Sequence, residues 1–115
     1  MGATVHIHRP KAKWKDRARS YKIVSDEKVV AEVKNGDSIS FQVEPGQEHT
    51  IYAKIDWTKS NPVIVSLSEG DEVHLGVAND VNMMRFLGGP EGIIRVLVAE
   101  KNSYLSLGPV EPPGS

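Results

Sequence analysis

Apolar residues recur at every second position in five separate runs of this chain, and this alternation constrains the fold more than any other feature. The alternating positions are Val5 and Ile7; Ile39, Phe41 and Val43; Ile51, Ala53 and Ile55; Val63, Val65 and Leu67; and Val73, Leu75 and Val77. Successive side chains of a strand point to opposite faces of a sheet, so this spacing predicts strands with one buried face. No stretch with convincing helical spacing interrupts them.

Turn signals separate the alternating runs. They are Asp26-Glu27, Asn35-Gly36, Pro45-Gly46, the break at 59–62, and Glu69-Gly70. Asn-Gly suits a two-residue hairpin whose central residues need positive φ, and Pro-Gly suits a type II turn. Their spacing of roughly 9 to 14 residues is close to the rhythm of an antiparallel sandwich or barrel.

These signals predict strands at 3–9, 19–25, 28–34, 37–43, 48–56, 62–67 and 71–78. After a less regular stretch, residues 92–100 and 103–108 are predicted to form a closing hairpin. A chain of 115 residues is the size of one domain. We therefore predict one all-β antiparallel β-sandwich, Ig-like in architecture, over residues 1–108, with about seven to nine strands. Residues 109–115 are predicted to be a flexible Pro- and Gly-rich tail.

The central part of the chain carries a family resemblance. The stretch SYKIVSDEKVVAEVKNGDSISFQVEPGQEHTIYAKID, followed by a polar turn, an alternating strand and LSEGDEVHLGVA, resembles the PEGA-like group of small bacterial β-sandwich domains. The resemblance covers about residues 20–78. It departs from the usual pattern at Asp26-Glu27, where Asp-Gly is common, and at Gln47-Glu48, where one residue is commoner before the histidine. The resemblance implies a β-sandwich that acts as a binding or structural module, and it supplies no catalytic residues to assign to positions of this chain.

Residue composition excludes several kinds of site. The chain has no cysteine, so disulfides, thiolate metal sites and cysteine nucleophiles are excluded. Its first residues contain no apolar run long enough for a signal peptide or a membrane span, so we expect a cytoplasmic protein.

Positive charge is concentrated near the start of the chain. Residues 1–22 contain seven basic residues and one acidic residue, whereas the rest contains the other seven basic residues and fourteen acidic ones. The loop 9–19 is a candidate polyanion-binding surface, through Arg9, Lys11, Lys13, Trp14, Lys15, Arg17 and Arg19. Lys and Arg neutralise phosphates and the indole is available for stacking on a base or for a lipid interface. The alternative is a solvated connection between two strands.

The segment NDVNMMRFLGGPEG supplies a second candidate surface. Met83, Met84, Phe86 and Leu87 form an apolar cluster without clear periodicity. If exposed, the cluster is a candidate contact for a protein partner or for a second copy. The alternative is that it packs over one open end of the sandwich.

Two further features have structural and functional interpretations. His6 and His8 lie two apart on a predicted strand and project from one face, a geometry that ligates zinc or copper if a third ligand approaches. We expect both to face solvent and predict no metal site, since no spacing places His49 or His74 beside them. The pair Asp56-Trp57 is predicted to be a structural corner, with Trp57 capping the core.

No catalytic motif is present, because the chain lacks a Gly-x-Ser-x-Gly elbow, a His-Glu-x-x-His helix and a nucleotide-binding glycine fingerprint. We therefore expect a non-enzymatic binding or structural module without a cofactor or a small-molecule substrate. It would recognise a protein partner or self-associate through loops and sheet edges. Binding of nucleic acid or another polyanion, or of an anionic membrane, through residues 9–19 is the alternative, and a small hydrolase is a distant third.

Overall fold

The structure, a computed structural model, describes residues 2–10, 20–55, 58–78, 94–96 and 106–110. Its elements are β1 (Ala3–His8), β2 (Tyr21–Ser25), β3 (Lys28–Val33), β4 (Ser38–Val43), β5 (Glu48–Ile55), β6 (Thr58–Lys59), β7 (Val63–Ser66), β8 (Glu72–Ala78), β9 (Ile94–Val96) and β10 (Ser106–Pro109). Eight of these strands have four residues or more, and β6 and β9 are shorter. The predicted all-β sandwich is confirmed.

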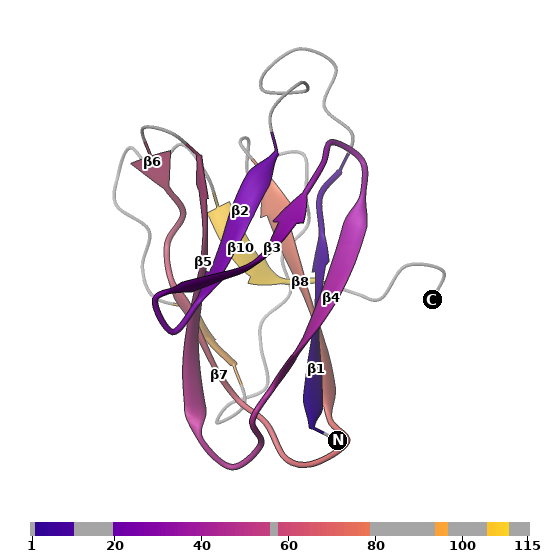
Figure 1. Cartoon of the computed structure of the whole chain (residues 1–115), viewed down its shortest axis with the longest axis vertical. Coiled ribbons are helices and arrows are strands. Elements are labelled where there is room, and N and C mark those ends of the chain that lie inside the picture. The colour runs from indigo at the N-terminus through magenta and orange to yellow at the C-terminus, as the bar shows by residue number, and fades with distance from the viewer. Residues whose placement is uncertain (1, 11–19, 56–57, 79–93, 97–105, 111–115) are drawn as a thin grey trace.

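Two sheets make the sandwich (Figure 1). The four-stranded sheet has the order β10-β8-β1-β4, and the six-stranded sheet has the order β3-β2-β5-β7-β9, with β6 paired to β5. The pairing of β1 with β8 is parallel, and the other pairs in the described part of the chain are antiparallel. The parallel pair places the start of the chain beside residues 72–78.

The core lies between the sheets and consists of the alternating apolar residues. The side chains with 0 % exposure include Val5, Ile7, Ile51, Ala53, Val63, Val65, Leu75 and Val77. Each buried Val, Ile or Leu side chain contributes about 1.5–3 kcal/mol relative to an exposed position. In β4 the burial is weaker, since Ile39 and Phe41 are only partly buried. The prediction that the alternating apolar residues face the core is therefore confirmed in β1, β5, β7 and β8, and these residues are buried less completely in β4.

The Asn35-Gly36 turn does not make the hairpin that its sequence favours. Gly36 has a φ of 77°, and the amide of Asp37 donates to the carbonyl of Lys34 at 3.0 Å. The two strands that flank this turn belong to different sheets: β3 is at the edge of the six-stranded sheet and β4 at the edge of the four-stranded one. The turn is tight as predicted, but it carries the chain across the sandwich (Figure 1).

Within the described residues, β9 and β10 do not pair with each other as the predicted closing hairpin near the C-terminus requires. Strand β9 pairs with β7 in the six-stranded sheet, whereas β10 pairs with β8 in the four-stranded sheet. A side-chain amide links β10 to the opposite sheet: Asn61 donates through Nδ2 to the carbonyl of Leu107 at 2.8 Å and accepts from its amide at 3.0 Å. These two hydrogen bonds satisfy the backbone amide and carbonyl of Leu107, which the partner strand of a hairpin would otherwise have satisfied.

The fold extends slightly beyond residue 108. Pro109 is buried within β10, and the amide of Val110 donates to the carbonyl of His74 at 3.0 Å. Both residues therefore belong to the folded part rather than to the predicted tail. Residues 111–115 lie outside the described residues.

Candidate functional site

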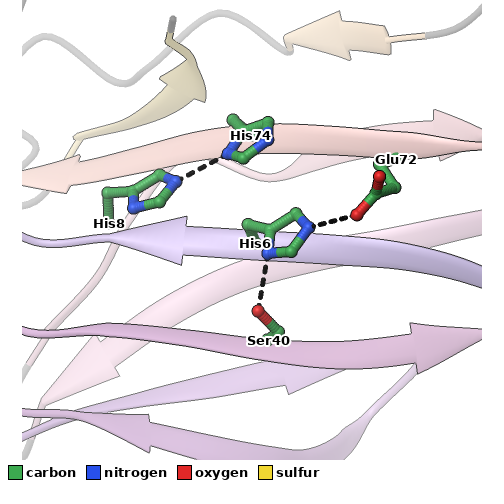
Figure 2. Close-up of polar contacts among 5 residues, drawn as sticks. All are labelled: His6, His8, Ser40, Glu72 and His74. Atoms are coloured by element: carbon green, nitrogen blue, oxygen red, sulfur yellow. Dashed lines mark hydrogen bonds and ion pairs between the residues drawn. The ribbon is translucent and has the colours of Figure 1, made fainter. Parts of the chain in front are cut away.

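Three of the four histidines meet on the outer face of the four-stranded sheet. His6 and His8 are on β1 and alternate with the buried Val5 and Ile7, so both imidazoles point away from the core. The parallel register of β1 and β8 places His74 directly beside His6. His8 faces Gly76, which has no side chain, so its imidazole has room to reach His74 (Figure 2). We call His6, His8, His74 and the adjacent Glu72 the histidine cluster.

Serine hydroxyls on β4 orient the two histidines of β1. Nδ1 of His6 lies 2.6 Å from Oγ of Ser40, and Nδ1 of His8 lies 2.7 Å from Oγ of Ser38. Each serine is the direct cross-strand neighbour of its histidine in the β1–β4 register. With Nδ1 held toward β4, the Nε2 atom of each ring is directed toward β8.

The two Nε2 atoms have different partners on β8. Nε2 of His6 lies 2.9 Å from Oε1 of Glu72, and Nε2 of His8 lies 2.8 Å from Nδ1 of His74 (Figure 2). The rings of His8 and His74 have centroids 5.1 Å apart and planes that differ by 6°. Two facing nitrogens at 2.8 Å with this centroid separation mean that these rings meet edge to edge, in nearly one plane. His6 lies against His74 with centroids 4.4 Å apart.

The cluster favours neutral imidazoles at two positions. Burial, then the neighbouring His74 and His6, hold the pKa of His8 below its ordinary value of 6.5. Burial and His6 likewise lower the pKa of His74, although Glu72 opposes this shift. An N–H···N bond also requires one neutral acceptor, which agrees with these directions.

The cluster agrees only in part with the sequence prediction. His6 and His8 do share the outer face, but each is bonded to side chains of neighbouring strands rather than simply facing water. His74 joins them only because β1 pairs with β8, which no local signal indicated. Within the described residues, no group of three or more His, Asp or Glu side chains is arranged to hold a metal ion.

His49 lies in the other sheet and has a structural role. Its Nε2 donates to the carbonyl of Glu44 at 2.7 Å, and its Nδ1 lies 2.5 Å from Oδ2 of Asp26. Burial opposes charge on this ring, but the hydrogen bonds to Asp26 and Glu44 outweigh it and raise the pKa of His49.

Arg9 is not on a polyanion-binding surface. Its side chain is only 3 % exposed, and Nη1 donates to the carbonyl of Val33 at 3.1 Å. The guanidinium also lies 3.6 Å from the ring centroid of Tyr21, close enough for a cation–π interaction. The prediction that Arg9 belongs to the polyanion-binding surface was wrong, because its guanidinium is buried and bonded within the fold.

The other predicted site residues fall outside the part of the chain that the structure describes. They are Lys11, Lys13, Trp14, Lys15, Arg17 and Arg19 of the basic loop, Met83, Met84, Phe86 and Leu87 of the apolar cluster, and the pair Asp56-Trp57. The interpretations of these residues stay predictions.

A second surface feature is the edge strand β3. Val29 and Val30 are 53 % and 42 % exposed, the large exposed hydrophobic side chains of the described residues. Among the described strands, β3 pairs only with β2. The register shifts between Ile23 and Val24, so Val30 is an extra residue in β3 and forms a bulge. The alternation of apolar residues did not predict that Val29 and Val30 are exposed, because nothing in the sequence Lys-Val-Val-Ala-Glu-Val marks the position of the bulge.

The outer face of the six-stranded sheet carries an open hollow of about 530 Å³, lined by Asp26, Glu27, Thr50, Tyr52 and Lys59. Asp26 is engaged by His49, and the Lys59 ammonium lies 5.5 Å from the ring centroid of Tyr52. Two of the charged groups that line this hollow, Asp26 and Lys59, therefore already have partners within the sheet.

Comparisons with family models, curated proteins and solved structures returned no match for this chain. The PEGA-like resemblance therefore stays a prediction. In the part of the chain that the structure describes, no helix has the length and apolar character needed to cross a bilayer.

Proposed function

We propose that this protein is a non-enzymatic structural module that self-associates through its edge strand β3. The observation that carries the proposal is the pair of adjacent exposed valines, Val29 and Val30, on a strand with one described partner. Exposed apolar side chains on an edge strand favour contact with another chain. The role also agrees with what the PEGA-like resemblance implies.

Charge complementarity favours a second copy as the partner. In an antiparallel arrangement with a two-fold axis at Val30, Val30 meets its own symmetry mate and Lys28 faces Glu32 of the second copy. The same pair recurs on the other side of the axis, since such an interface is isologous. Lys28 and Glu32 are both exposed, so their charged groups are accessible for these contacts.

The bulge at Val30 limits the strength of this contact. It interrupts the regular hydrogen-bonding pattern of the strand edge, so the interface depends on side chains more than on added backbone bonds. A contact along one short strand is smaller than the roughly 1,200–2,000 Å² buried in stable complexes. We therefore expect a weak, concentration-dependent dimer.

Sedimentation equilibrium on the purified chain, over the widest accessible range of concentration, tests the proposal. Lys28→Glu and Glu32→Lys each place like charges opposite each other at both symmetric positions, so each variant alone should dimerise about 5- to 30-fold more weakly. An equimolar mixture of the two variants restores both attractive pairs and should form a heterodimer.

Glu69→Lys is the matched control, because Glu69 is exposed in the turn before β8 and has the same charge change as Glu32→Lys. It should leave the dimer unchanged. Since Glu32 also faces Lys22 within the sheet, thermal melting must show that Glu32→Lys is folded. A wild type that stays monomeric at every concentration, or variants that fail to recover on mixing, would contradict the proposal.

The alternatives have less support. The residues of the polyanion interpretation lie outside the described part of the chain, apart from Arg9, which is buried. No observation in the described residues favours the hydrolase alternative.

A further inference from the structure

We infer that His8 and His74 form a two-nitrogen binding site for a divalent transition-metal ion such as Zn²⁺, Ni²⁺ or Cu²⁺, on the outer face of the four-stranded sheet. Nε2 of His8 and Nδ1 of His74 face each other at 2.8 Å. Imidazole nitrogen is a ligand that suits these three ions. This site is independent of the proposed contact at β3, which lies in the other sheet.

The facing nitrogens need little movement to accept an ion. Two nitrogens that bind one ion at about 2.0–2.1 Å in tetrahedral geometry are about 3.4 Å apart, so the present separation would widen by about 0.6 Å. Rotations of the two imidazoles, which now meet edge to edge, supply this change and turn both lone pairs toward the ion. The strands themselves keep their register, because β1 and β8 are paired through their backbones.

Binding replaces one hydrogen bond and releases no net proton from the neutral rings. One proton lies between the two nitrogens in the metal-free state. It moves to the other nitrogen of the ring that carries it, which leaves both facing nitrogens with free lone pairs. Neutral imidazole is the form that binds metals.

Ser38 prepares His8 for this role. Its hydroxyl lies 2.7 Å from Nδ1 of His8, which fixes the ring and leaves Nε2 as the coordinating atom. A metal-binding histidine usually has its other ring nitrogen held in this manner, and loss of that contact typically weakens binding 10- to 100-fold. Ser38 is therefore a positioning residue.

Glu72 and His6 complete the surroundings. The Glu72 carboxylate is 61 % exposed and lies 2.9 Å from Nε2 of His6, so it supplies negative charge beside the pair. The described residues contain no ready-made group of three ligands. Water therefore fills the other coordination positions, and the affinity is lower than that of a structural zinc site, which uses four protein ligands.

Isothermal titration calorimetry of the tag-free full chain with ZnCl₂, and separately with NiCl₂, tests the inference. The wild type should bind one ion, and His8→Gln or His74→Gln should abolish this binding. Ser38→Ala should weaken it about 10-fold. His6→Gln is the matched control, because it removes a histidine of the cluster but leaves the pair, and its affinity should stay within about threefold of wild type. MgCl₂ should not bind, since Mg²⁺ prefers oxygen ligands.

Histidine ring signals in nuclear magnetic resonance spectra of the wild type keep the test decisive if a variant fails to fold. Zn²⁺ should shift the ring signals of His8 and His74 before those of His49. The inference is overturned if the wild type shows no binding beyond that of His8→Gln, if His74→Gln retains full affinity, or if the first shifts occur at His49.

Discussion

Nδ1 of His49 lies 2.5 Å from Oδ2 of Asp26, and this contact joins the β2–β3 turn to the start of β5. The other ring nitrogen donates to a carbonyl, which only accepts, so both nitrogens donate when the carboxylate is ionised. His49 is therefore an imidazolium within an ion pair. Asp26 also accepts from the amide of Thr50 at 3.1 Å, so one carboxylate holds two adjacent residues of β5.

The ion pair should make stability depend on pH in a predictable direction. The pKa of His49 is raised, so its contribution is fully present below the unfolded value of 6.5 and is lost as pH rises through the folded pKa. Burial opposes ionisation of Asp26, but bonds from His49 and Thr50 lower its pKa, so its contribution is present above 3.8 and is lost as pH falls through the folded pKa. Both contributions are complete between these two unfolded values.

Urea unfolding of the wild type and Asp26→Asn checks this prediction. We expect Asp26→Asn to lower the free energy of unfolding by about 1 kcal/mol at pH 5.5, a figure reduced for the partial exposure of Asp26, and by less at pH 9. The comparison with Asp26→Asn removes effects of other titrating groups, including His8 and His74. An equal difference at the two pH values would rule out the ion pair as the cause.

The turn between β2 and β3 should become more stable with a glycine. Asp26 and Glu27 have φ values of 51° and 72°, in the left-handed region that a two-residue type I′ hairpin requires. Asp tolerates this conformation, and here its carboxylate is bonded to β5, but Glu27 has no such benefit. Glu27→Gly should therefore raise the free energy of unfolding by about 0.5 kcal/mol, the relief of strain minus the entropy cost of glycine.

Gly70→Ala is the matched test of the same effect. Gly70 has a φ of 84°, and an added Cβ meets nothing within 4 Å, so backbone strain is the cost. Denaturant unfolding should show a loss of about 1 kcal/mol. If both variants shift stability in the same direction, backbone strain is not the explanation.

Removal of the Arg9 side chain should lower the stability of the fold, because its guanidinium makes buried contacts. Arg9→Ala leaves the Val33 carbonyl without its guanidinium donor and removes the contact with Tyr21, at an expected cost of about 2–3 kcal/mol in denaturant unfolding. Lys22→Ala, at an exposed position of β2, should cost less than about 0.5 kcal/mol. Comparable losses in both variants would show that the buried contacts of Arg9 contribute little.

The amide of Asn61 should govern the attachment of β10. Asn61→Ala leaves the buried amide and carbonyl of Leu107 unsatisfied, which should cost about 2–4 kcal/mol. Amide hydrogen exchange should accelerate at Leu107 more than at Ile51, which lies in the middle of the opposite sheet. Unchanged protection at Leu107 would mean that the bond from its amide to Asn61 does not govern the attachment of β10.

Local features of this fold were predictable from the sequence, and the choice of sheet was not. Alternation in β5 and β8 predicted which side chains are buried, because side-chain direction follows from backbone geometry alone. The Asn35-Gly36 turn shows the limit of such signals. Its residues select positive φ, but the direction of the next strand depends on packing between the sheets.

The histidine cluster was missed for the same reason. The spacing of His6 and His8 predicted a common face, but their approach to His74 requires a parallel pairing between strands whose partner residues are 68 positions apart in the sequence. The bond between Asp26 and His49 likewise joins a turn to a strand that the sequence presents separately. Contacts of this type follow from the strand order, which alternation does not specify.

The position of β1 also determines when the sheet can assemble. As Figure 1 and the strand order show, β1 lies between β4 and β8, so its second neighbour is β8, at residues 72–78. During synthesis the first strand emerges from the ribosome long before that neighbour exists. The four-stranded sheet is therefore completed only after most of the chain has been made, and until then one side of β1 lacks the neighbour that covers it in the finished fold.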